Sequence, residues 1–390
     1  MSKNEKRVVV SVSKESYLWL IGFIVFFGLL GNVMGMKNMF NTLMSTAHDL
    51  LLNTVFYIMA IAVIAGAVGA LLVEFGVISL INKVLSPLMK PLYDMPGAAS
   101  VGVLTTYLSD NPAIISLAKD KGFVRYFKKY QIPALTNIGT AFGMGLIVTT
   151  FMIGQAPSGQ NFLPAAVIGN VGAIIGSIVS VRLMLRHTKK AYGTEAPASN
   201  EGESGMDVMN LREIRQGSVF QRALEAILDG GKTGVDMGLS IIPGVLVICT
   251  LVMMLTNGPA GDGGVYIGAK YEGVPVLPWI GQKLSFILEP LLGFKHAEAI
   301  AFPVTALGAV GAAIGLVPNF IKSGLIGANE IAVFTAMGMC WSGYLSTHVA
   351  MMDSLDAREL TNKAILSHTI GGLAAGISAH FIYMLYTMIF

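Results

Sequence analysis

The sequence predicts an all-α polytopic membrane protein with about seven transmembrane helices and two re-entrant helical hairpins in inverted-topology repeats. Three observations predict it. Of the 390 residues, 54% are hydrophobic and only 13% are charged, which does not fit a soluble globular chain with an ordinary surface. Two apolar stretches are interrupted near their middle by polar or glycine-rich residues. Finally, landmarks of the first half recur in the second half at a nearly constant spacing.

The N-terminal residues 1–16 are polar and basic, and an apolar run of about 20 residues, Tyr17–Met36, follows them. It has no small-residue cleavage pattern, so we expect a retained extra transmembrane helix rather than a signal peptide. The other predicted spans are Leu50–Val73, Gln131–Gly154, Phe162–Leu185, Val235–Leu255, Asn329–Met352 and Ile365–Tyr386.

Two further apolar stretches, Gly97–Leu117 and Ala297–Phe320, are each long enough to cross a bilayer once. Ser109–Pro112 interrupts the first, and Pro303 and several glycines interrupt the second. Two half-helices of about ten residues would each be about 15 Å long, which is half the hydrocarbon core. Each stretch is therefore either a broken span or a hairpin that returns to the side it entered from.

The distribution of Lys and Arg separates these alternatives. With two hairpins and a cytoplasmic N-terminus, 21 of the 26 basic residues lie inside and five outside. With two additional crossings, 11 lie inside and 15 outside. Because cytoplasmic loops carry an excess of Lys and Arg, the sequence predicts hairpins. We expect a location in the inner, cytoplasmic membrane of the cell.

The broken span Gln131–Gly154 is the first landmark that recurs. Ile331–Trp341 lies 199 residues after Ile132–Phe142, with Ile, Thr and Gly identical at equivalent places. Two other landmarks keep a similar spacing and are listed here: Gly172 and Gly176 with Gly372 and Gly376, and Leu85–Leu88 with Leu288–Leu291. These matches predict an internal repeat.

The predicted repeats cover residues 50–186 and 218–390. Each contributes three crossings, an odd number, so the second repeat lies inverted relative to the first, as in many secondary transporters. Residues 187–217 between them are polar and acidic and lack an apolar face. We expect a flexible cytoplasmic linker there.

The run from Leu85 to Gly154 resembles the Gate or nucleoside-recognition domain, through Pro87-Leu88, Met95-Pro96-Gly97, the hairpin and the Thr- and Gly-broken span. This domain occurs in concentrative nucleoside transporters, in the membrane part of ferrous iron transporters and in spore maturation membrane proteins. The resemblance implies that two hairpin tips and two broken helices form substrate and sodium sites, carried by a moving domain.

By position, these places are Ser109–Pro112, Thr136–Thr140, Leu307–Gly311 and Thr335–Ser342. The sequence departs from the family at two points. The second hairpin tip carries no charged side chain, unlike the tip expected of a nucleoside site. The sequence also lacks the GxxxxGK[ST] phosphate loop of the GTPase module in iron transporters.

The candidate substrate-binding residues are Asp110, Asn111, Thr136, Asn137, Gly139, Thr140, Gly308, Thr335, Gly338 and Ser342. An ionised carboxylate at membrane depth normally faces a cavity, a counter-ion or a proton path, which favours Asp110. Asn111 offers both a donor and an acceptor. The alternative for both is that they only cap the returning half-helix.

Hydroxyl and amide oxygens at a broken helix suit a hard cation such as sodium. Asp110, Thr136, Asn137 and Thr335 are therefore the ion-coupling candidates, and a bound sodium ion is the only cofactor we expect. Their alternative role is hydrogen bonding between packed helices. His348 lies inside an apolar span and is either a proton-relay candidate or a packing residue.

These features predict a secondary active transporter, a symporter of a nucleoside-like or other small polar solute coupled to sodium or protons. It would work by alternating access around a midplane site. The expected partners are the lipid bilayer, the solute and further copies of the chain, and no nucleic acid polymer. Enzymatic motifs are missing from the sequence. The alternatives are a non-transporting membrane partner protein and a metal channel or permease using Met339 and Cys340.

Overall fold

The computed structural model describes residues 10–199 and 206–390, and within these ranges it contains helices and no strand. In these described ranges, six helical segments are long and apolar enough to cross a membrane: Lys14–Met34, Met36–Glu74, Lys129–Gly154, Leu163–Tyr192, Val219–Met254 and Arg358–Ile389. The protein is thus an all-α polytopic membrane protein, which confirms the predicted fold class.

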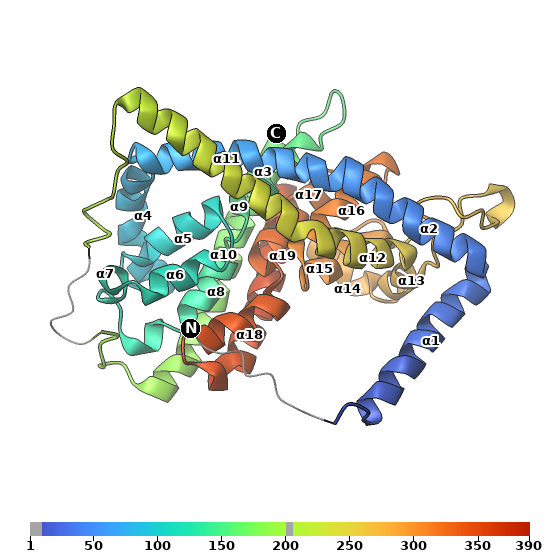
Figure 1. Cartoon of the computed structure of the whole chain (residues 1–390), viewed down its shortest axis with the longest axis horizontal. Helices are drawn as coiled ribbons and strands as arrows, with labels where there is room; N and C mark the ends of the chain where they lie inside the picture. Colours follow the sequence, from blue (N-terminus) through green and yellow to red (C-terminus); the bar gives the residue numbers. More distant parts are fainter. Residues whose placement is uncertain (1–9, 200–205) are drawn as a thin grey trace.

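The first helix, α1 (Lys14–Met34), extends away from the body of the molecule (Figure 1). It ends at Gly35, whose φ of 80° turns the chain into α2 (Met36–Asp49). This helix continues through a π-helical segment, η1 (Leu50–Val55), into α3 (Phe56–Glu74). The helix therefore begins 14 residues before the predicted start at Leu50, because neither Gly nor Pro interrupts the amphipathic residues of α2.

The second half contains a similar long helix. It consists of α11 (Val219–Pro243), the π-helical segment η3 (Gly244–Cys249) and α12 (Thr250–Met254). The predicted span started at Val235, but the Ser218 hydroxyl accepts a bond from the Gln221 amide and starts the helix earlier. Helices α3 and α11 run side by side across the molecule (Figure 1).

Helices α10 (Leu163–Tyr192), α17 (Ala328–Trp341) and α19 (Thr361–Ile389) pack together. Close approach requires glycine, since a Cβ on Gly176 would lie 2.4 Å from the Gly371 carbonyl oxygen. The equivalent pair in the second half, Gly372 and Gly376, instead faces Trp341 and Met337 of α17. The two glycine pairs therefore match in sequence but pack against different helices.

Each half contains an amphipathic segment followed by a helical hairpin. In the first half these are α4 (Val77–Tyr93), α5 (Ala99–Leu108), α6 (Ala113–Lys119) and the short α7 (Lys121–Val124). In the second half they are α13 (Val276–Lys283), α14 (Ser285–Leu292), the 3-10 turn η5 (Ala297–Ile300), α15 (Ala301–Ala306) and α16 (Val310–Lys322). Remaining short 3-10 turns are η2 (Lys129–Gln131), η4 (Asp262–Gly264) and η6 (Arg358–Leu360).

Both predicted broken spans are interrupted. The first consists of α8 (Ala134–Thr140) and α9 (Gly145–Gly154), and the second of α17 and α18 (Tyr344–Ser354). Left-handed backbone marks both breaks, at Met144 (φ 55°) and at Gly343 (φ 72°). Met144 and Gly343 are 199 residues apart, the same spacing as the sequence repeat.

The described parts of the predicted linker pack onto the first half. The Lys129 amide donates to the Ala196 carbonyl at 2.8 Å, and the Ala198 amide donates to the Phe127 carbonyl at 3.0 Å. Farther along, Arg215 forms an ion pair with Glu74 at 2.8 Å. These linker residues are therefore held against the hairpin base and the end of α3.

Candidate functional site

A cavity of about 270 Å³ lies where both hairpin tips and both helix breaks meet the long helix of the second half. Asp110 and Asn111 come from the first tip, and Gly308 comes from the second. The complete lining is Asp110, Asn111, Met144, Ser240, Ile241, Gly244, Gly308, Ala309, Val310, Gly311, Ala312, Ser342, Gly343 and Thr347. The chain thus gathers its four interrupted segments around one small polar space.

Asn111 joins the first hairpin tip to the break in the second half. Its side chain is 1% exposed. Nδ2 donates to the Ser342 carbonyl at 2.9 Å and to the Thr347 hydroxyl at 3.3 Å, while Oδ1 accepts from the Ser342 hydroxyl at 3.1 Å. Every polar atom of this buried amide therefore has a partner, as a buried polar group requires.

Each break is also bonded to the hairpin tip of its own half. The Met144 amide donates to the Ser109 carbonyl at 3.1 Å, and the Gly343 amide donates to the Ala306 carbonyl at 3.0 Å. Freed backbone groups at the breaks are thus satisfied by the tips, which is how interrupted helices are tolerated at membrane depth. The equivalent bonds confirm that the halves share one local architecture.

Asp110 is the one carboxylate among the described residues that line the cavity. Its Oδ1 accepts a bond from the Asn111 amide at 2.7 Å, which orients the carboxylate at the start of the turn into α6. The returning chain begins with Pro112, whose missing N–H would have had no helical partner. The second carboxylate oxygen is available to a donor group or a cation.

Four of the ten predicted binding residues line the cavity, namely Asp110, Asn111, Gly308 and Ser342. Gly139 and Gly338 do not. A Cβ on Gly139 would lie 2.7 Å from Ile114 of α6, and one on Gly338 would lie 3.2 Å from Phe302 of α15. Both glycines are therefore points where a broken helix packs closely against its own hairpin.

The other four predicted residues are buried in helix contacts away from the cavity. The Thr335 hydroxyl donates to the Ile331 carbonyl at 2.7 Å, and Thr140 lies 4.0 Å from the Met351 sulfur. Asn137 donates to the Ser180 hydroxyl at 2.9 Å and to the Ala364 carbonyl at 3.1 Å. Among the described atoms, Thr136 Oγ1 and Asn137 Oδ1 have no hydrogen-bond partner.

Several lining residues were not found by sequence reasoning. Ser240 and Ile241 lie on α11, and Gly244 begins η3, within one long helix that has no polar interruption there. The π-helical segment beginning at Gly244 shifts the helix register at this point, and a single sequence gives no signal for it. Thr347 follows the second break by four residues on the regular helix α18, so no polar interruption marks it in the sequence.

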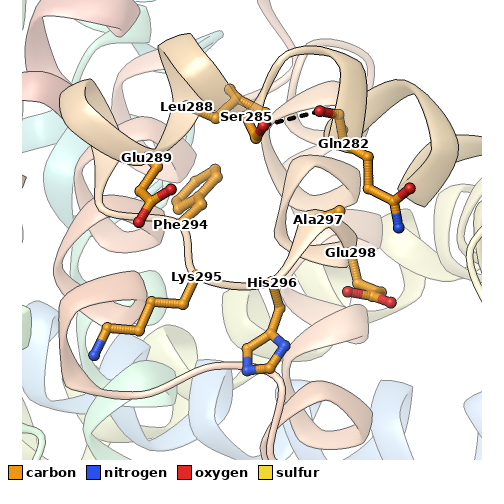
Figure 2. A pocket seen from close by; sticks show the side chains of 10 residues that line it. Gln282, Ser285, Leu288, Glu289, Phe294, Lys295, His296, Ala297 and Glu298 are labelled. Carbon is orange, nitrogen blue, oxygen red and sulfur yellow. Dashed lines mark hydrogen bonds between the residues drawn. The ribbon is translucent and has the colours of Figure 1, made fainter.

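A second cavity, of about 340 Å³, lies between α13, α14 and η5. Figure 2 shows Glu289 and Lys295 at one edge of it and Gln282 and Glu298 at the other. Most of these side chains are exposed, and none belongs to a helix break. Within residues 10–199 and 206–390, no group of three or more His, Cys, Asp and Glu side chains is arranged to hold a metal ion.

The comparisons with known proteins support the fold. No family model matches the chain. An uncharacterized protein of Alkalihalophilus pseudofirmus is 23% identical over 295 residues, covering 72% of this chain and 58% of that protein. The chain therefore spans less than two thirds of the length of this relative.

Solved structures of the concentrative nucleoside transporter CNTnw are similar over nearly the whole chain. For its inward-facing substrate-bound state, the TM-score is 0.53 at 14% identity, covering 94% of this chain and 84% of CNTnw. For a double variant in an outward-facing state, the TM-score is 0.54 at 13% identity, covering 95% and 85%. At these identities the likeness shows a shared fold.

Proposed function

We propose that this protein is a secondary active transporter of a small polar solute, with nucleosides as the first class to test. The observation that carries the proposal is the single cavity formed by both hairpin tips and both helix breaks. In inverted repeats, exchanging the conformations of the halves exposes a shared site to either side of the membrane. The fold likeness to CNTnw, whose structures include inward- and outward-facing states, supports the same function.

The size and lining of the cavity support a small polar solute. Drug-sized ligands occupy pockets of about 300–1,000 Å³, so a cavity of about 270 Å³ accommodates a small molecule. Ser240, Ser342 and Thr347 supply hydroxyl groups, and Met144 and Ile241 supply apolar surface. Such a lining suits a solute with several hydroxyl or amide groups and one flat or apolar part.

Within this proposal, Asp110 binds a donor group of the solute or the coupling cation. Asn111 and Ser342 hold the tip against the break, and Gly308 lets the second tip approach the solute with its backbone. The coupling ion is sodium or a proton, with Asp110, Thr136, Asn137 and Thr335 as the sodium candidates. We further propose insertion in the inner membrane as a homo-oligomer with a cytoplasmic N-terminus.

The proposed function is tested by uptake of ³H-uridine and ³H-adenosine into proteoliposomes, with and without sodium and pH gradients. Asp110→Asn removes the charge but keeps the shape of the side chain. We expect it to lower uptake at least about tenfold, equivalent to about 1.4 kcal/mol, without changing the melting temperature in detergent.

Asp236→Asn is the matched control, because Asp236 is an exposed carboxylate on the same long helix that lines the cavity. It should transport like the parent protein. If the parent protein takes up neither uridine nor adenosine under any gradient, and the same assay with labelled amino acids is also negative, the transporter proposal is wrong and the non-transporting partner role is favoured.

A further inference from the structure

The segment before α11, residues 206–215, is bonded at both of its ends. We call this segment the strap, and it is the yellow-green chain that leads to the start of α11 in Figure 1. Its first residues contact the base of the first hairpin, and its last residues contact the end of α3 and the first half of α11. The strap therefore joins two parts of the molecule that form different walls of the cavity.

At its first end, the strap is bonded to the base of the hairpin through Asp207. This carboxylate accepts a hydrogen bond from the Tyr126 hydroxyl and forms an ion pair with Arg125 at 3.3 Å. The Met206 carbonyl oxygen lies so close to α7 that a Cβ on Gly122 would lie 2.0 Å from it. The absence of a side chain at Gly122 thus lets the strap reach the hairpin base.

At its second end, the strap covers the last turn of α3. Arg212 Nη1 donates to the Glu74 carbonyl oxygen. Arg215 forms ion pairs with the Glu74 carboxylate and with Asp229 of α11, both at 2.8 Å, and Arg222 of α11 bonds Glu74 at 2.7 Å. Glu74 is 3% exposed, and a buried charge is tolerated only where it is paired. This end of the strap is therefore held by a partly buried ion-pair network.

Between its two ends the strap is folded into a turn. The Asp207 carbonyl oxygen accepts from the amides of Asn210 and Leu211 at 3.1 and 2.7 Å. Arg212 lies five positions after Asp207, and an extended chain spans about 3.3–3.6 Å per residue, so five residues reach at most about 18 Å. The hairpin base and the end of α3 can thus move apart only if the turn opens or one end of the strap detaches.

The hairpin base is joined to the cavity by one short helix. Helix α6 has seven residues and connects the tip residues Asp110 and Asn111 to α7, which contains Gly122. Across the cavity, α11 contributes Ser240, whose hydroxyl donates to the Met237 carbonyl of its own helix at 2.7 Å. The strap is therefore bonded to the base of one cavity wall and to the helix of another.

We propose that the strap is a restraint that slows movement of the first hairpin relative to α3 and α11. The inference rests on the proposed transport function, since a solute enters and leaves the cavity only when the cavity walls separate. Detachment of either end of the strap lets these walls separate more often. Because the strap is separate from the cavity lining, it changes the rate of transport without contacting the solute.

Two variants loosen opposite ends of the strap. Gly122→Ala places a methyl group where the strap backbone lies, and Arg212→Gln removes the guanidinium that bonds the end of α3. Glu213→Gln is the matched control, because Glu213 is an exposed strap residue whose side chain has no hydrogen bond or ion pair within the described chain. If Gly122→Ala does not fold, Tyr126→Phe takes its place, since it removes only the hydroxyl that bonds to the strap.

The first measurement needs no solute. Spin labels at Lys119→Cys on α6 and Glu225→Cys on α11 report the distance between the hairpin base and the long helix in the detergent-solubilised chain. Both positions are exposed, and the native Cys249 and Cys340 are buried and stay unlabelled. The parent should give one narrow distance distribution. Each loosened variant should populate longer distances about two- to tenfold more, the change expected when one hydrogen bond is lost.

The second measurement is the initial rate of ³H-uridine uptake into proteoliposomes. Because conformational steps limit the rate of many proteins of this kind, both loosened variants should raise the rate about two- to tenfold, and Glu213→Gln should match the parent. A strap that only supports the fold would lower the melting temperature of the variants and leave the distance and the rate unchanged, which overturns the inference. Longer distances without faster uptake overturn it too.

The outcomes separate the strap from the proposed function. If the parent protein takes up no uridine while the loosened variants show longer distances, the nucleoside proposal fails and the strap stands as a restraint on the hairpin. If the parent takes up uridine and both variants keep its distance distribution, the strap inference fails and the transport proposal stands.

Discussion

Glu272 shows how one side chain organises a loop that the sequence left undefined. This carboxylate is 0% exposed and lies between α12 and α13. Oε1 accepts from the amides of Ala260 and Ile267 at 3.0 and 2.9 Å, and Oε2 accepts from those of Gly268 and Ala269 at 2.8 and 3.1 Å. Four backbone donors converge on one carboxylate, so its charge holds the loop together.

These bonds predict a pH-dependent stability. Burial alone raises the pKa of Glu272, but the four backbone donors outweigh it and hold the pKa below its usual value. The stabilisation is therefore complete above about pH 4.5, the value for an unperturbed Glu, and is lost as the pH falls through the lower folded-state pKa. Glu272→Gln should cost about 1.5–3 kcal/mol at pH 7, since hydrogen bonds to a charged group are lost.

Melting temperatures in detergent at pH 7 and pH 4 check this prediction. The difference between Glu272→Gln and the parent protein should shrink at the lower pH. Glu289→Gln, which alters an exposed carboxylate on α14, is the control and should match the parent at both values. An equal difference at both pH values would show that shape rather than charge matters.

The site was predictable where a residue interrupts an apolar stretch. Asp110 and Asn111 were found because a charged and an amide side chain stand inside a membrane-length run. Glu272 and Thr347 were missed because each lies among polar neighbours or on a regular helix, where only folding shows what a side chain faces. Asn137 satisfied the same sequence criterion as Asp110, yet its side chain bonds to Ser180 of α10 and Ala364 of α19.

At the scale of elements, the hairpins and broken spans were predicted and their packing partners were not. The repeated GxxxG pairs suggested equivalent contacts, but Gly176 faces α19 whereas Gly376 faces α17. A pattern of small residues predicts close approach and does not identify the helix that approaches. Likewise, apolar residues alone could not reveal the π-helical segments η1 and η3, because their sequences resemble ordinary helix.

The contact between α10 and α19 predicts a large effect from one methyl group. Gly176→Ala would place a Cβ 2.4 Å from the Gly371 carbonyl oxygen and 2.5 Å from the Ala375 Cβ, both in the packed centre of α19. Separating the helices should cost about 1–3 kcal/mol, more than the gain of about 1 kcal/mol in helix propensity. The melting temperature of the variant should fall accordingly.

Gly22→Ala is a suitable control, because no atom lies within 4 Å of a Cβ built at Gly22 on α1. It receives the same gain in helix propensity without the collision, so its melting temperature should stay level or rise. A Gly176→Ala protein as stable as Gly22→Ala would show that α10 and α19 can separate without cost.

For the whole molecule, the order of elements in one half is repeated in the other: a long helix with a π-helical segment, an amphipathic segment, a hairpin, a broken helix and a final helix. If each half crosses the membrane three times, as the sequence predicts, equivalent elements lie at opposite faces. Lys83 on α4 and Lys283 on α13 are exposed and occupy equivalent amphipathic segments. The first should face the cytoplasm and the second the outside.

Single-cysteine labelling tests this inversion without removing native thiols, because Cys249 and Cys340 are both buried. A membrane-impermeant maleimide should label Lys283→Cys in intact cells and Lys83→Cys only after the membrane is opened. Lys14→Cys at the start of α1, on the side that we propose to be cytoplasmic, should react under the same conditions as Lys83→Cys. If Lys83→Cys and Lys283→Cys react from the same side, the halves are not inverted. In that case, exchanging the conformations of the two halves could not carry a solute across the membrane. The cavity would open to the same side of the membrane in both states.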